Sequence, residues 1–375
     1  MVAKVIIIGA VIAVAVLCTI WFLVPFINDI TSGVDPAARY EDKPNVEFAA
    51  DTISESTSSD TVTEADWVIN EVKSNYSIKN DPYYDNGRII FSTDNDVSNG
   101  IMADAVAIYD VASQETTILP NVTKKYDNII MTRLSGNYAI WVDCMKAGGG
   151  RICGYDLSKQ EMFVVKEFGY AIPYISINDN YIAFTQVAGE NEQRLYLYDI
   201  ASRTNTTVKV YESKDVTCGK CDISDTSLVW SEYATDGRAV LRVLDLTGGT
   251  AQPKEYNLGD WVFKPRTNGE YILYTTRDNS LEADLMLSDG NSNTVRVATG
   301  VLEYEIGEDY IVYSKGEQIF AAPIDKAQQS QLVSGDMMRA MFSSFNGKHL
   351  CFYDVTDNFG QIDSVRYVYI DREEN

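Results

Sequence analysis

Seven polar or amphipathic residues recur at one place in a repeated pattern, and four of them carry charge. Each lies eight residues before an aromatic residue that closes a short apolar run, and the position after it is mostly apolar. Two guanidinium groups and two carboxylates that converge would hold a ligand through charge-assisted hydrogen bonds. The seven positions are Tyr83, Arg133, Ser176, Asp222, Arg266, Glu305 and Ser344.

The single histidine limits the other chemistry that the chain can perform. It is His349, beside an apolar run. A Ser-His-Asp triad is therefore not expected, and a histidine-rich metal site cannot form within one chain. Carboxylate pairs are available in principle among 54 acidic residues, but the sequence does not single one out. We predict no metal site and no cofactor.

Two of the six cysteines flank a glycine-rich stretch that predicts a hairpin loop, Met145–Ile152. If Trp141 pairs with Asp156 across this hairpin, then Cys144 lies directly opposite Cys153. We therefore predict a cross-strand disulfide, in an oxidising compartment.

A second pair, Cys218 and Cys221, forms a C-x-x-C motif. No second C-x-x-C motif is present to complete a zinc site, and no alternation of strands with helices surrounds it as a thioredoxin would require. A local disulfide is the favoured interpretation, with free thiols and a redox pair as alternatives.

The chain of 375 residues has a formal net charge of −23. An acidic surface repels phosphate backbones, so nucleic acid is not expected as a partner. Such a surface keeps an exported domain soluble, and the alternatives are binding of a cation or of a basic partner.

A repeat of about 43 residues must position all of these side chains. Each unit has an apolar run that ends in an aromatic anchor, then a second run that closes on an aspartate; in four of the seven units the two are 15 residues apart. The anchors are Phe91, Trp141, Phe184, Trp230, Tyr274, Tyr313 and Phe352. The aspartates are Asp110, Asp156, Asp199, Asp245, Asp289, Asp325 and Asp371, and we expect them to cap the turn after the third strand.

Alternation of apolar and polar residues, as in Leu195–Asp199, indicates strands. Repeats of this length with four short strands each predict an all-β protein, a seven-bladed β-propeller. Six or eight blades are the alternatives. The last repeat lacks an outermost strand, so we expect Ala65–Lys73 to supply it and close the ring. The seven polar residues would then line the central channel, either as a ligand site or as balanced ion pairs in a water-filled channel.

The N-terminal segment is predicted to be a membrane anchor. Residues 5–27 are apolar and uncharged, and 23 helical residues reach about 34 Å, enough to cross a bilayer. Lys4 precedes the segment and acidic residues follow it, so the N-terminus is expected in the cytoplasm and the propeller outside. The predicted organisation is an uncleaved single-pass anchor at 1–28, a flexible polar linker at 29–65 and the propeller at 66–375.

Units such as Asn178–Phe184 followed by Leu195–Ile200 resemble the WD-like repeats of the TolB-like β-propeller family. The resemblance extends over residues 80–371, but the Ser-Pro-Asp-Gly turn typical of that family is replaced, for example by Thr267–Glu270. It implies a divergent member, a protein-binding or sensing propeller of the cell envelope.

The favoured functional hypothesis is a non-enzymatic module on the outer face of the cytoplasmic membrane, which binds a protein or a cell-envelope polymer through loops on a rigid disc. One alternative is a hydrolase or lyase that acts on envelope glycans through paired carboxylates. The other is a structural or sensory subunit of a membrane complex.

Overall fold

The computed structural model describes residues 68–80, 82–95, 102–212, 215–247, 254–256, 258, 261–278, 280, 282–290, 293–335, 339–346, 349–355 and 362–369. They belong to one compact unit, Glu64–Asn375. The predicted anchor at 5–27 and linker at 29–65 lie outside the described residues. Within the described ranges, no helix has the length and apolar character needed to cross a bilayer.

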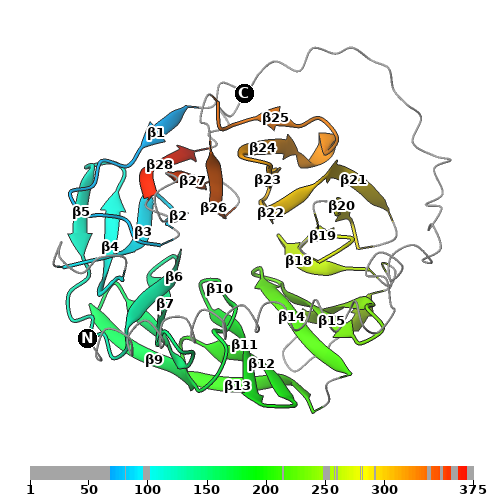
Figure 1. The fold of residues 1–375 in the computed structure, drawn as a ribbon, viewed down its shortest axis with the longest axis horizontal. Helices are drawn as coiled ribbons and strands as arrows, with labels where there is room; N and C mark the ends of the chain where they lie inside the picture. The colour runs from blue at the N-terminus through cyan, green and yellow to red at the C-terminus, as the bar shows by residue number, and fades with distance from the viewer. Residues whose placement is uncertain are drawn as a thin grey trace, which may run out of the picture. The chain divides into compact units, whose positions relative to one another are not determined.

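Seven four-stranded antiparallel sheets are arranged around a central axis, so the seven-bladed β-propeller is confirmed (Figure 1). We number the blades along the chain. Blade 1 consists of β2 (Tyr83–Asp85), β3 (Arg88–Thr93), β4 (Ala105–Asp110) and β5 (Glu115–Ile118). Blade 2 consists of β6 (Asn128–Ser135), β7 (Tyr138–Cys144), β8 (Gly150–Asp156) and β9 (Glu161–Phe168). Blade 3 consists of β10 (Ile175–Ile177), β11 (Tyr181–Gly189), β12 (Glu192–Asp199) and β13 (Thr204–Tyr211).

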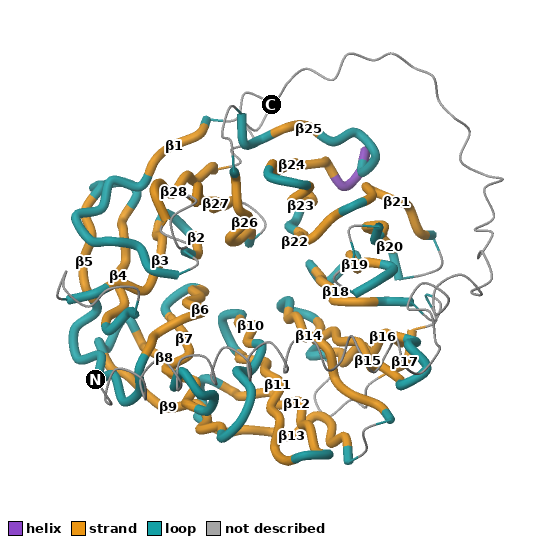
Figure 2. Tube along the Cα trace, in the orientation of Figure 1, coloured by secondary structure: helices purple, strands orange, loops and turns teal. Residues whose placement is uncertain are grey.

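The remaining blades follow the same order from the axis outward. Blade 4 consists of β14 (Val216–Ile223), β15 (Ser227–Ala234), β16 (Ala239–Asp245) and β17 (Lys254–Tyr256). Blade 5 consists of β18 (Phe263–Thr267), β19 (Ile272–Thr275), β20 (Asp284–Ser288) and β21 (Thr294–Thr299). Blade 6 consists of β22 (Val301–Ile306), β23 (Tyr310–Lys315), β24 (Gln318–Pro323) and β25 (Gln331–Leu332). Blade 7 consists of β26 (Ala340–Phe345), β27 (His349–Val355), β28 (Ile362–Tyr369) and β1 (Ile69–Glu71). Figure 2 shows that the described part is built of strands, with one short 3₁₀ helix, η1 (Ile324–Lys326).

The ring is closed as the sequence predicts. β1 pairs with β28, so a segment from the start of the described chain forms the outermost strand of blade 7. Ile69 lies opposite Val368, and the Val72 amide donates to the Val365 carbonyl at 2.9 Å. The closure covers an edge of β28 that would otherwise be open to pairing with another chain.

The aromatic anchors lie on the second strand of each blade, and all seven are at most 4% exposed. The predicted turn caps are present in blades 1 to 5. Asp110, for example, accepts hydrogen bonds from the Ser113 amide at 2.8 Å and hydroxyl at 2.9 Å. Asp325 lies instead in η1, and Asp371 lies outside the described residues. Both repeated signals therefore reflect local strand and turn chemistry.

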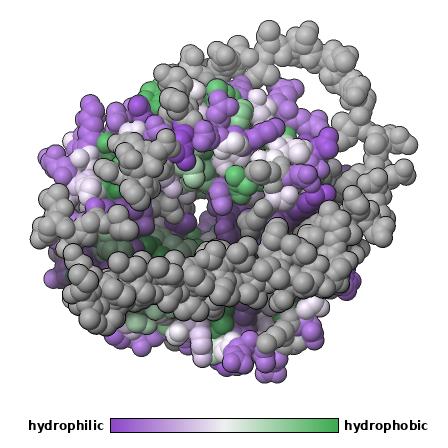
Figure 3. Space-filling view, viewed as in Figure 1, coloured by the Kyte–Doolittle hydropathy of each residue, from purple (hydrophilic) through white to green (hydrophobic). Residues whose placement is uncertain are grey.

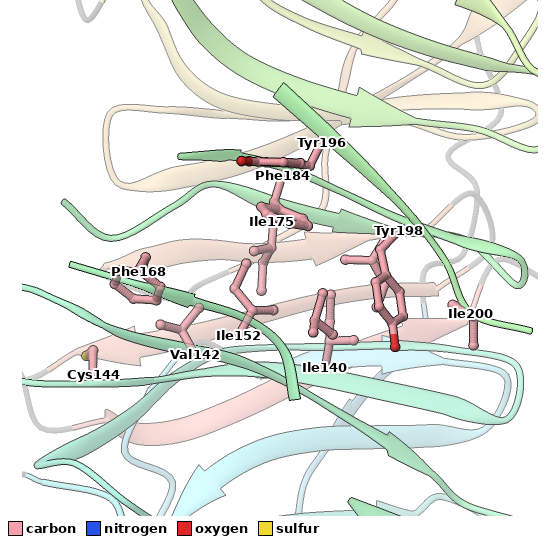
Figure 4. Close-up of a cluster of buried hydrophobic side chains, with 12 residues drawn as sticks. Ile140, Val142, Cys144, Ile152, Phe168, Ile175, Phe184, Tyr196, Tyr198 and Ile200 are labelled. Carbon is pink, nitrogen blue, oxygen red and sulfur yellow. The ribbon is translucent and has the colours of Figure 1, made fainter. Parts of the chain in front are cut away.

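The apolar core lies between blades rather than within one sheet. Among the described residues, each of the seven junctions between neighbouring blades has its own cluster of buried side chains. Figure 4 shows the cluster between blades 2 and 3, in which Ile140 and Val142 of β7 belong with Ile175 and Tyr198 of blade 3. Each sheet is thus apolar on both faces, and the propeller surrounds a channel lined by the innermost strands.

Candidate functional site

A cavity of about 290 Å³ occupies one end of the central channel, and all seven predicted polar positions line it. It lies at the end where the first strand of each blade turns into the second; we call this the inner-turn face. Viewed along the axis, the molecule has a central opening with hydrophilic residues along part of its edge (Figure 3). Of the predicted site, Arg133, Asp222, Arg266 and Glu305 all contribute to the lining.

A second ring of small residues, polar in six of the seven blades, lines the same cavity, and the sequence analysis missed it. These residues lie six positions before each aromatic anchor, so the signal was present in the repeat. Since side chains two apart on a strand point to the same side, this ring continues the first one toward the turns. The members are Asp85, Ser135, Asn178, Ser224, Asn268, Gly307 and Asn346.

The second ring links one blade to the next. The Asn346 side chain donates to Asp85 Oδ1 at 2.8 Å, which joins blade 7 to blade 1. The side-chain amide of Asn178 donates to the Ser224 carbonyl at 2.8 Å, and the side-chain amide of Asn268 donates to the Gly307 carbonyl at 2.7 Å. These bonds satisfy the turns and hold the rim of the cavity rigid, which is what a preorganised site requires.

Three of the four predicted charged residues form one group. Arg266 Nε lies 2.8 Å from Glu305 Oε1. The Nε–H bond does not point at Oε1, so the contact is an ion pair rather than a hydrogen bond. Asp222 accepts hydrogen bonds from the Ser176 hydroxyl at 2.9 Å and the Thr267 amide at 3.0 Å, from the blades on either side. Each carboxylate oxygen keeps capacity for a further bond, because a carboxylate offers about four lone-pair positions.

Glu305 has the protonation behaviour of a group that can exchange a proton near neutral pH. Burial in the channel raises the pKa of its carboxyl from 4.5 to about 7, although the neighbouring Arg266 guanidinium lowers it. The side chain retains 25% exposure, which lets it exchange a proton with the cavity. A carboxyl with a pKa near the working pH is suited to general acid–base catalysis.

Arg133 is placed differently from Arg266. Its guanidinium lies 5.3 Å from the centre of the Tyr83 ring, and its Nη1 donates to the Thr132 carbonyl at 2.9 Å. Within the described ranges it forms no ion pair, so several of its five N–H donors remain available to a ligand. Ser344 is 2% exposed and accepts a hydrogen bond from the Tyr84 amide at 3.2 Å, so its hydroxyl serves the blade junction.

The lining is acidic overall. Two guanidinium groups face five carboxylates, of which three belong to turns or their flanks: Asp85, Asp225 and Glu308. This balance disfavours a strongly anionic ligand at the inner-turn face. In the part of the chain that the structure describes, no three potential metal ligands converge.

His349 is a structural residue. It is buried on β27, its ring centre lies 4.4 Å from that of Tyr84, and its Nδ1 lies 3.1 Å from Asn346 Oδ1. These contacts place His349 in the junction between blades 7 and 1.

The predicted register of the β7–β8 hairpin was wrong by three residues, and with it the disulfide between Cys144 and Cys153. Tyr138, not Trp141, pairs with Asp156, so Cys153 lies opposite Trp141 and Cys144 opposite Gly150. The loop is shorter than predicted because Gly148, Gly149 and Gly150 take positive φ angles that other residues rarely adopt. Both cysteines are free and buried.

The favoured disulfide between Cys218 and Cys221 does not form either. Both lie on β14, where they pair with Glu232 and Trp230 of β15, and both are free and buried. Burial raises the pKa of the Cys221 thiol to about 12. A thiol of this kind is an inert core residue.

No family model matches the sequence, and no curated protein does. Solved structures match its fold. The β-propeller domain of the Trilobed protease from Pyrococcus furiosus has 9% identity and a TM-score of 0.57, over 78% of this chain and 93% of that one. An oligogalacturonate lyase in complex with manganese has 11% identity and a TM-score of 0.54, over 82% of this chain and 97% of that one.

The acylaminoacyl peptidase from Pyrococcus horikoshii has 10% identity and a TM-score of 0.57, and this chain spans 51% of its length. TolB from Acinetobacter baumannii is also found, with 15% identity and a TM-score of 0.46, over 66% of this chain and 63% of that one. The β-propeller part of the TolB-like prediction is supported by the three structures with TM-scores above 0.5. The prediction of a non-enzymatic binding module is not: the neighbours with the higher scores are enzymes or parts of enzymes by name.

Proposed function

We propose that the cavity at the inner-turn face is the active site of an enzyme that hydrolyses glycosidic bonds. The observation that carries this proposal is that Glu305, with a pKa of about 7, shares one cavity with the carboxylate of Asp222. Two carboxyl groups in different settings, one able to donate a proton and one held as an acceptor, are the requirement for glycoside hydrolysis.

The composition of the lining favours a sugar over a peptide. Serine, asparagine and carboxylate side chains of both rings surround the cavity, and such groups match the hydroxyls of a pyranose. A peptidase triad would need a histidine, and the only one, His349, is buried in a blade junction. By its name, the oligogalacturonate lyase also acts on a glycan, and it is matched over almost its whole length.

In the proposed reaction, Glu305 protonates the glycosidic oxygen as the bond to the sugar carbon breaks, and Asp222 assists the water that adds to that carbon. Arg266 keeps Glu305 in place through the 2.8 Å ion pair. Arg133 is available to bind a hydroxyl of the substrate. The predicted anchor at 5–27 would hold this site outside the cytoplasm, beside cell-envelope polymers.

The test is cleavage of a panel of neutral and mixed polysaccharides by the full-length chain, followed as new reducing ends. Glu305→Gln and Asp222→Asn should each lower the rate by about 100-fold or more, which is the usual contribution of a positioned acid or base. The wild-type rate should fall as pH rises above about 7, because Glu305 then loses the proton it donates.

Glu167→Gln is the matched control. Glu167 is an exposed carboxylate on the outer strand β9, ion-paired with Lys125 at 2.7 Å, and its loss should leave the rate unchanged. Cleavage that survives both site variants, or a folded protein that cleaves nothing in the panel, would contradict the proposal. Products that carry a new conjugated double bond would show that the enzyme cleaves the glycan by elimination and not by hydrolysis.

A further inference from the structure

Beyond the cavity, the innermost strands continue along the channel toward the face opposite the inner turns. Five of the seven innermost strands contain a register shift: β6, β14, β18, β22 and β26. A bulge re-aims the side chain at the extra residue. In β18 that residue is Lys264, whose φ of 48° lies in the left-handed region. Strained non-glycine residues of this kind often mark functional positions.

The bulge of β14 places Lys220 toward the channel. The charges that act on its ammonium are Glu303, Arg266, Lys264 and Glu305, all on the innermost strands of blades 5 and 6. Lys220 precedes Asp222 by two residues, on a strand that runs toward the inner turns, so it lies about 6 Å farther from those turns. This part of the channel therefore holds Lys220 near Glu303 and near Lys264, whose own Nζ lies 3.6 Å from Asp278 Oδ1.

Lys220 is held against an aromatic ring rather than a carboxylate. Its Nζ lies 5.0 Å from the centre of the Tyr174 ring. Among the described residues, the Tyr174 ring is the one group that the Lys220 ammonium contacts. Burial lowers the pKa of Lys220, so keeping the ammonium charged there costs free energy. A bound anion would offset that cost.

Tyr174 belongs to the segment that joins β9 to β10, and this segment exposes rings to solvent. Tyr174 is 46% and Tyr170 is 55% exposed. The segment is nonetheless fixed, because the Gly149 amide donates to the Tyr170 carbonyl at 2.7 Å and the Thr185 amide to the Tyr174 carbonyl at 3.2 Å. An exposed ring on a fixed backbone offers an apolar face for stacking, with a polar edge in water.

We propose that Lys220 and Tyr174 form a second binding subsite, farther along the channel from the inner turns than the cavity, for the carboxylate and the ring of an acidic sugar residue. The inference rests on the proposed function, because it takes the ligand to be part of a glycan. It narrows the substrate class: the glycan carries a uronate residue that the acidic inner-turn cavity disfavours and that Lys220 and Tyr174 accept, next to the neutral residue that is cleaved.

The test measures binding of D-glucuronate and D-glucose to the full-length chain by titration calorimetry. Wild type should bind glucuronate more tightly than glucose, and Lys220→Met should weaken glucuronate binding about tenfold, the loss expected for one charge-assisted hydrogen bond. Tyr174→Ala should weaken both sugars. Lys166→Met is the matched control, because Lys166 makes the same kind of contact with Tyr196, at 4.9 Å, away from the channel.

Unchanged glucuronate affinity in Lys220→Met would overturn the subsite. If inorganic phosphate competes as well as glucuronate and Tyr174→Ala has no effect, the site is a simple anion site and the sugar assignment is wrong. Glu305→Gln separates the two proposals. If the Glu305→Gln protein is inactive but still binds glucuronate, both the proposed function and the subsite are supported. If it still cleaves polysaccharides, the proposed function is wrong, and the binding measured for Lys220→Met then decides the subsite alone.

Discussion

At the scale of single residues, the informative feature is a carboxylate kept beside an arginine inside the channel. Neighbouring charges act on Glu305 from several innermost strands: Arg266, Asp222, Arg133 and Glu303. Burial outweighs the arginines, so the neutral form of Glu305 is favoured relative to a solvent-exposed glutamate. With a pKa of about 7, Glu305 is partly protonated at neutral pH, unlike an ordinary glutamate in an ion pair.

The raised pKa makes a prediction about stability. Between pH 4.5 and about 7 the folded protein binds more protons at Glu305 than the unfolded chain does. The stability contributed by this group is thus fully present below the unfolded pKa and is lost as pH rises through about 7. The free energy of unfolding of wild type minus that of Glu305→Gln should therefore fall by up to about 3 kcal/mol as pH rises from 4.5 to about 7.

Urea denaturation on both sides of the window provides the measurement, with Glu167→Gln as the variant for which the difference should not change. A difference between wild type and Glu305→Gln that stays constant with pH would show that Glu305 is not protonated near neutrality.

At the scale of strands, the closure by β1 is short but apolar. It pairs over three residues with β28, and the Ile69 side chain packs against the cluster between blades 6 and 7. The neighbouring residue Val68 is 66% exposed. The side chain at position 69 therefore contributes apolar burial to the closure, and the one at 68 contributes little.

Ile69→Ala should lower the free energy of unfolding by about 1–2 kcal/mol, since it removes partly buried apolar surface at the junction. Val68→Ala is the internal control and should change it by less than about 0.5 kcal/mol. Both are measured by chemical denaturation of the full-length chain. Equal effects of the two substitutions would argue that β1 does not hold the ring closed in solution.

At the scale of the whole molecule, each blade packs on two neighbours and the ring has no free end. An open array of repeats can lose its end units first, but a closed ring must break two junctions to release any blade. We expect the propeller to unfold in a single transition, with tryptophan fluorescence and far-ultraviolet circular dichroism giving the same midpoint.

Phe184→Ala, which removes a fully buried anchor, should move both midpoints together to lower denaturant, with a loss of about 3–5 kcal/mol. Val164→Ala, at a position 45% exposed, should move neither. Two separated transitions, or a shift seen by one probe only, would mean that blades unfold independently.

The sequence by itself determined the number of blades, the buried anchors, the turn caps of blades 1 to 5 and the closure. It also placed Arg133, Asp222, Arg266 and Glu305 on the channel, because a strand alternates sides every residue and the repeat presents that alternation seven times. The second ring could have been found by the same count. These features are local, or are repeated often enough for spacing alone to reveal them.

The tertiary structure decided what depends on how blades lie against each other and on how sharply a turn bends. It paired Arg266 with Glu305 and left Arg133 against Tyr83, a choice between neighbours that are far apart in the sequence. It also set the β7–β8 register, through three glycines with positive φ angles that shortened the loop and moved Cys144 away from Cys153. Charge pairing across blades and turn geometry arise from three-dimensional packing, so residue spacing does not encode them.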